Sequence, residues 1–151
     1  MEQLQQAVFS TKQVSGNDGK IAPVSQIFLN GMASDKSLVG ACLEACFKTQ
    51  TGYLVFMTEN CPFEETLDIH LLDEHLNVLD SASLFWPYNT GKFRLLKKME
   101  PNIVTFKFFD SAEWMVRVEK TKITHIPFFS EPKGVFRKLT LSRHFTIRKK
   151  I

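Results

Sequence analysis

The chain has 151 residues, of which 44% are hydrophobic and 23% charged, an ordinary composition for a soluble globular protein. No apolar run approaches the roughly 18 residues of a membrane-spanning helix, and the first residues lack the basic and apolar segments of a signal peptide. Three cysteines without regular spacing suit a reducing compartment, so we expect a cytoplasmic protein with no membrane contact and one domain over residues 1–151.

Charge is divided unequally along the chain. Residues 1–90 contain four Lys/Arg and eleven Asp/Glu, a net charge of −7, whereas residues 91–151 contain fifteen Lys/Arg and five Asp/Glu, a net charge of +10. Such a chain either neutralises itself internally or presents oppositely charged patches to a partner.

Strand patterns begin near residue 21. Residues 21–29 predict an edge strand, because Pro23 has no N–H to donate to a central ladder. Residues 34–49 alternate in polarity and favour a strand in a hairpin with the buried strand 52–59. The start at Ser34 and Asp35 leaves a helix as the alternative for residues 34–49.

Short strands with polar turns fill the rest of the chain. In the strand that starts at Leu67, Asp68 and His70 lie on the face opposite Leu67 and Ile69. Residues 103–109 and 113–120 are rich in β-branched and aromatic side chains and predict a hairpin. The other expected strands cover residues 76–84, 91–99, 122–129 and 138–151. The last of these would bury Leu139, Leu141, Phe145 and Ile147.

Eight to ten short strands with short connections predict an all-β, antiparallel, single-domain fold with little helix. The two architectures that fit are a closed barrel and a two-sheet sandwich.

Residues 65–81 contain five carboxylates and two histidines but no lysine or arginine. Asp68, His70, Asp73 and His75 could hold a metal ion, since Asp68 and His70 share a strand face. Structural zinc sites, however, mostly use pairs of Cys and His. We therefore expect no metal and a hairpin with a solvated acidic face.

No catalytic motif is present, and we expect no catalytic residue and no cofactor. Cys42 and Cys46 would lie roughly 13 Å apart on a strand, beyond disulfide reach. Cys61 is flanked by acidic residues, which disfavour the reactive thiolate.

The acidic segment and the neighbouring aromatic loop form the expected surface for a protein partner. Seven carboxylates lie between Glu59 and Asp80, and Trp and Tyr are common anchors at interfaces. The candidate residues are Glu59, Glu64, Glu65, Asp68, Asp73, Glu74, Trp86 and Tyr88.

The C-terminal segment offers an alternative surface for nucleic acid, because residues 133–150 contain many Lys/Arg and no acid. Phe136 and Phe145 could stack on bases, or could be core residues in phase with the leucines. The candidate basic patch is Arg137, Lys138, Arg143, Arg148, Lys149 and Lys150.

The sequence thus predicts a non-catalytic module that binds a macromolecule, most simply a protein, as a small inhibitor, immunity-type protein or adaptor would. The alternatives are a nucleic-acid-binding module and, third, a small-ligand barrel or an enzyme without a recognisable motif.

Overall fold

The structure is a computed structural model that describes every residue except 17, 19, 110, 125–130 and 151, and omits the side chains of residues 98–100. The described residues form thirteen β-strands in three antiparallel sheets, with no helix and no sheet closed into a barrel. This confirms the expected all-β antiparallel fold, in the form of stacked sheets.

The sheets are named by their place in the chain. The N-terminal sheet contains, in spatial order, β2 (Phe9–Ser15), β3 (Val24–Leu29) and β4 (Met32–Val39). The central sheet contains β1 (Glu2–Gln3), β5 (Cys42–Lys48), β6 (Gly52–Thr58), β7 (Leu67–Asp73), β8 (Val78–Leu84) and β12 (Val135–Phe136). The C-terminal sheet contains β13 (Ser142–Lys150), β11 (Glu113–Thr124), β10 (Ile103–Lys107) and β9 (Arg94–Glu100).

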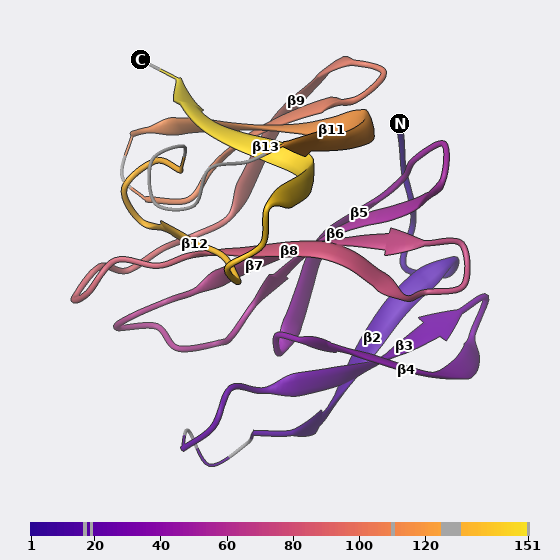
Figure 1. The fold of residues 1–151 in the computed structure, drawn as a ribbon. Coiled ribbons are helices and arrows are strands. Elements are labelled where there is room, and N and C mark those ends of the chain that lie inside the picture. Colours follow the sequence, from indigo (N-terminus) through magenta and orange to yellow (C-terminus); the bar gives the residue numbers. More distant parts are fainter. Residues whose placement is uncertain (17, 19, 110, 125–130, 151) are drawn as a thin grey trace.

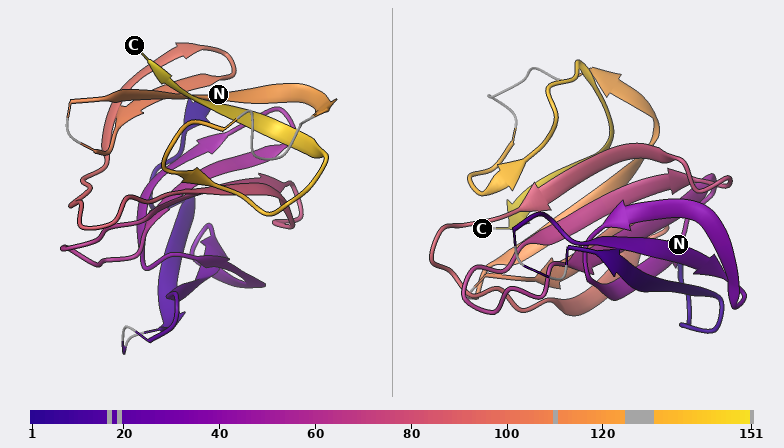
Figure 2. Two further views of the ribbon diagram at one scale, coloured as in Figure 1. Left: turned by 60° about the vertical axis from the view of Figure 1, so that its left-hand side comes forward. Right: turned by 90° about the horizontal axis from the view of Figure 1, so that it is seen from below.

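The central sheet lies between the other two, so both of its faces are covered (Figure 1). One face packs against the C-terminal sheet in the larger core, which includes Phe56, Phe106 and Phe145. The opposite face packs against the N-terminal sheet in a smaller core, which includes Phe9, Ile27 and Met57. Figure 2 shows the three layers from two further directions.

Burial on both faces explains the side chains of β7. Six of its seven residues are buried, including Asp68 and His70, which alternate with the leucines and isoleucine of the larger core. The alternation was predicted correctly, but the face expected to be solvated is covered by the N-terminal sheet. The sequence of β2, FSTKQVS, is too polar to reveal that it covers another sheet.

The ambiguous segment 34–49 is extended, as favoured, but it forms two strands in different sheets. The chain passes from β4 to β5 at Gly40, whose φ is 131°, a conformation that L side chains rarely adopt. A Cβ at this position would lie 2.4 Å from the Cβ of Met57, so the crossing also needs the small residue. The expected hairpin of β5 with β6 is present.

Two details of the strand predictions were wrong, and a third lies partly outside the described residues. Residues 24–29 form the central strand of the N-terminal sheet, since Pro23 precedes the strand and leaves its ladder intact. Leu139 and Leu141 are 69% and 74% exposed because β13 begins only at Ser142, and Phe136 is 56% exposed. The strand expected over 122–129 is described only to Thr124, the end of β11, and the remainder lies outside the described residues.

Candidate functional site

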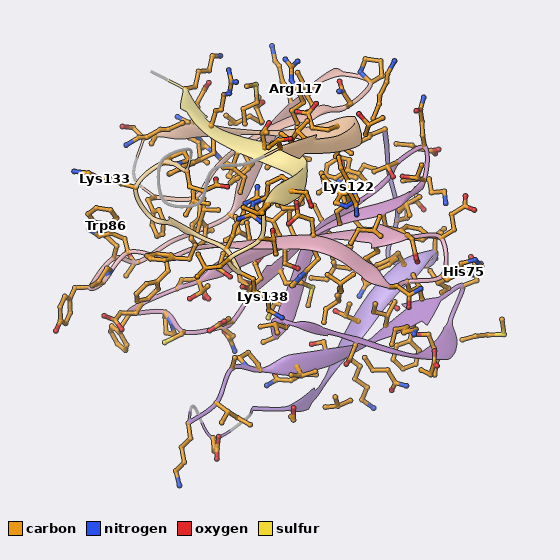
Figure 3. All side chains as sticks on the ribbon, viewed as in Figure 1. His75, Trp86, Arg117, Lys122, Lys133 and Lys138 are labelled. Atoms are coloured by element: carbon orange, nitrogen blue, oxygen red, sulfur yellow. The ribbon has the colours of Figure 1, made fainter. Side chains whose placement is uncertain are left out.

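The expected acidic patch is divided between the two ends of β7. Glu59, Glu64, Glu65 and Asp68 gather where β7 begins, whereas Asp73 and Glu74 lie at its far end, roughly 20 Å along a strand of this length. Figure 3 shows the separation, because His75 in the far turn and Trp86 beyond β8 lie on opposite sides of the molecule. These carboxylates therefore do not form one surface.

Glu65 fixes the loop between β6 and β7. Its carboxylate accepts hydrogen bonds from the backbone N–H groups of Glu59 (2.8 Å), Cys61 (3.1 Å) and Thr66 (3.1 Å). The side chain is buried, and this burial raises the pKa of Glu65 although the three hydrogen bonds oppose the change. Glu65 therefore has a structural role in this loop.

Asp68 is a buried carboxyl on the face of the central sheet that meets the N-terminal sheet. Ser83 Oγ donates a hydrogen bond to its Oδ1 at 2.6 Å, while Oδ2 has no partner among the described residues. Burial raises the pKa of Asp68 to about 7; the Ser83 hydrogen bond opposes this shift, and the neighbouring charge of Glu59 adds to it. Asp68 is therefore protonated in mildly acidic solution.

His70 connects two sheets as a neutral imidazole. Its Nε2 lies 2.9 Å from the carbonyl oxygen of Val39 in β4, and its Nδ1 lies 2.8 Å from Ser81 Oγ in β8. A carbonyl only accepts, so Nε2 carries the proton and Nδ1 accepts from the serine hydroxyl. Burial lowers the pKa of His70, which favours this neutral form.

Both ring nitrogens of His70 are thus engaged, which leaves none for a metal ion. The described part of the chain contains no group of three or more His, Cys, Asp and Glu side chains that could hold one. Asp73 accepts backbone hydrogen bonds from His75 (2.8 Å) and Asn77 (2.9 Å) and so shapes the turn. Glu74 is exposed and lies 3.9 Å from Lys48.

The shifted pKa of Asp68 gives the stability a defined pH dependence. The folded protein keeps a proton that the unfolded chain releases, so stability falls as the pH rises from about 4 to about 7, by at most about 1.4 kcal/mol per pH unit. Asp68→Asn lacks this proton, and its stability relative to the wild type should increase over that interval and then level off. Urea unfolding of both proteins at several pH values measures the difference. His70, whose pKa is lowered, makes a contribution of the opposite sign, because it reduces the stability of the folded protein as the pH falls below about 6.5. This contribution is common to both proteins. If the stability of the two proteins depended on pH in the same way, the raised pKa of Asp68 would be contradicted.

Two loops beside the start of β7 carry exposed aromatic side chains. The Glu64 carboxylate accepts a hydrogen bond from the backbone N–H of Tyr88 at 2.9 Å, which joins the β6–β7 loop to the β8–β9 loop. Phe63 is 82% exposed, Tyr88 93% and Trp86 44%. We call the two loops, with the side chains of Phe63, Trp86 and Tyr88, the aromatic loop pair. Glu64 lies close to the loop that carries Trp86 and Tyr88, as the sequence predicts.

The candidate basic residues fall into two groups. Arg137 and Arg143 are buried: Arg137 lies 3.0 Å from Asp80 and 2.9 Å from Glu131, and Arg143 donates to Thr140 and to the carbonyl of Lys138 (3.1 Å). They fix the segment before β13 against β8. The second group is exposed and consists of Lys138, Arg148, Lys149 and Lys150.

Sequence reasoning missed the cations outside the C-terminal segment that share the outer face of the C-terminal sheet with Arg148. Arg148 lies beside Met115, Met115 beside Thr105, and Thr105 beside Lys97, in a row across the C-terminal sheet. Arg94 and Arg117 are also exposed, and Arg117 points away from the core in Figure 3. Phe63 was missed too, although an aromatic residue next to Pro62 in a polar loop was a usable signal.

No known protein family, curated protein or solved structure matches the chain. In the described residues, no helix is both long enough and apolar enough to span a bilayer.

Proposed function

We propose that the protein is a non-catalytic module that binds another protein through the aromatic loop pair. The observation that carries this proposal is the exposure of Phe63 and Tyr88 on two loops that a hydrogen bond holds together. Exposed aromatic side chains on a rigid scaffold lose little conformational entropy on binding and are common anchors of interfaces.

The backbone supports a binding role for these loops. Tyr88 has a φ of 57°, which is unfavourable for a bulky residue, and its ring gains no burial in return. The Asn89 N–H donates to the Trp86 carbonyl oxygen at 3.2 Å and closes the turn that presents Tyr88. An exposed aromatic side chain on a strained backbone contributes little to the stability of the fold, so we expect Tyr88 to make its stabilising contacts in a complex.

The acidic residues have a smaller part in this proposal than the sequence predicts. Glu65, Asp68 and Asp73 form hydrogen bonds within the fold, and Asp80 pairs with Arg137. Reversing Glu65 or Asp68 to lysine would place a charge in the interior, so these substitutions would not test a surface. Glu64 remains at the loop pair, where it accepts from Tyr88.

Replacing Tyr88 with a photo-cross-linking amino acid should give one covalent adduct with a protein from nuclease-treated native extract. For the purified partner, we expect Phe63→Ser and Tyr88→Ser to weaken binding by about tenfold or more, because hot-spot aromatics dominate interface energies.

Met32→Ser is the matched control, because Met32 is 72% exposed but lies on the N-terminal sheet. It should leave both stability and affinity unchanged. Equal loss of affinity in Met32→Ser, or unchanged affinity in both loop variants, would refute the proposed surface.

Nucleic-acid binding is the second candidate, favoured by the outer face of the C-terminal sheet. Arg94, Lys97, Arg117 and Arg148 are exposed there, and within the described residues none of them forms an ion pair. Affinity for nucleic acid would then fall steeply as the salt concentration rises.

A further inference from the structure

A pocket of about 900 Å³ opens at the end of the C-terminal sheet next to Trp86. Phe109, Ser111 and Ala112, the last residues of β13, the β8–β9 loop and Lys133 line it. Figure 3 labels two of the lining residues, Trp86 and Lys133, which lie on the same side of the molecule. Its size is within the range of small-molecule sites. The side chains that define its chemistry are Trp86, Phe109, Trp114, Lys107, Lys133 and Lys149.

Among the described residues that line the pocket, positive charges outnumber negative ones. Lys150, at its edge, is paired with Glu113 at 3.1 Å. Lys107, Lys133 and Lys149 have no carboxylate at ion-pair distance in the described part of the chain. Three such ammonium groups around one concave surface repel one another and produce a local field that attracts a multiply charged anion.

The walls of the pocket are aromatic. Trp86 is 44% exposed, and its indole ring packs beside Gly134, where an added Cβ would lie 3.3 Å from the ring. Gly134 has a φ of 89°, which favours glycine, and the lack of a side chain there leaves room for the Trp86 ring. Trp114 is buried behind the pocket, with the Lys149 ammonium 6.0 Å from its ring centroid. A flat ring can therefore stack on the exposed part of the Trp86 indole while anionic groups reach the lysines.

We propose that this pocket binds a nucleotide, with the base against Trp86 and the phosphates among Lys107, Lys133 and Lys149. The nucleotide is either free or the terminal residue of a nucleic-acid strand, since both present a base beside a phosphate. This binding does not depend on the protein-binding function of the aromatic loop pair, although the two sites share Trp86.

Tryptophan fluorescence tests the proposal directly, because the chain contains two tryptophans and both line the pocket. Titration of the purified full chain with ATP, or with a short 5′-phosphorylated single-stranded oligonucleotide, should quench the emission to a saturating value. Tighter binding of ATP identifies a free nucleotide as the ligand, and tighter binding of the oligonucleotide identifies a strand end. Adenosine and inorganic triphosphate should each bind more weakly than ATP.

The double variant Lys133→Gln/Lys149→Gln should weaken binding by about tenfold or more, because it removes two of the three unpaired ammonium groups. Lys12→Gln/Lys20→Gln is the control: it makes the same change in net charge at exposed positions near the N-terminal sheet. Trp86→Ala, measured by calorimetry, should also weaken binding, and Trp86→Phe should restore part of it.

The proposal would be overturned if neither ATP nor the oligonucleotide quenched the fluorescence to a saturating value at millimolar concentration. It would also be overturned by triphosphate that binds as tightly as ATP, or by an equal loss of affinity in the charge-matched control. These outcomes leave the cross-linking test of the aromatic loop pair unaffected, so the two proposals fail separately.

Discussion

Replacing Arg137 with methionine is expected to lower the free energy of unfolding by about 3–5 kcal/mol, because it leaves the Asp80 carboxylate buried without its cation. The Arg137 side chain is 1% exposed and the Asp80 side chain 8%. Beyond its two ion pairs, Arg137 donates to the Phe145 carbonyl oxygen at 2.9 Å, and its guanidinium lies 4.2 Å from the Phe145 ring centroid. Asp80 also accepts the backbone N–H of His144 at 2.8 Å.

Denaturant unfolding at neutral pH measures this loss, and Arg148→Met is the control. Arg148 is an exposed arginine in β13, where a substitution changes stability by about 0.5 kcal/mol or less. Asp80→Asn in the Arg137→Met background should recover part of the stability, since it removes the carboxylate charge that Arg137 no longer compensates. A loss below about 1 kcal/mol for Arg137→Met would show that the network does not hold the C-terminal segment in place.

Gly52→Ala is expected to destabilise the protein by about 3 kcal/mol or more, through a clash within the central sheet. A Cβ at Gly52 would lie 1.9 Å from the carbonyl oxygen of Leu72 and 2.8 Å from the Cα of Asp73. These are backbone atoms of the paired strand β7, so relief requires β6 and β7 to separate at this end.

Gly31→Ala separates this clash from the general effect of losing a glycine. Gly31 has a φ of 78° but no atom within 4 Å of its added Cβ, so the expected cost is only the backbone strain of about 1–2 kcal/mol. Thermal unfolding of both variants would measure the difference. Equal losses would contradict the steric argument.

Local alternation was sufficient to predict most strands but not how many sheets they form. The hairpin of β10 and β11 was recognisable because β-branched and aromatic residues fill both strands. The passage between sheets at Gly40 was not, because a glycine inside an alternating segment is equally compatible with a continuous strand. Only the tertiary contact with Met57 shows why the crossing needs a glycine at this position.

The candidate site was only partly predictable, because charge in a sequence does not indicate its partner. Asp80 and Arg137 are 57 residues apart in the chain and neutralise each other in the fold. Glu65 and Asp68 satisfy local backbone and serine groups, which no charge count reveals. Part of the opposite charge of the two halves is therefore neutralised by internal pairing, while Arg94, Lys97, Arg117 and Arg148 on the C-terminal sheet form no ion pair among the described residues.

The two shortest strands have a consequence for self-association. A free edge of a β-sheet offers unpaired N–H and C=O groups on which another chain can add a strand, the first step of edge-to-edge aggregation. In the central sheet, β1 covers Phe47 and Lys48 of β5, and the Leu4 N–H donates to the Cys46 carbonyl oxygen at 2.8 Å. At the other edge, β12 covers Ser83 and Leu84 of β8, held there by a segment that the Arg137 ion pairs fasten. A second copy could pair with these covered residues only after displacing one of the two-residue strands.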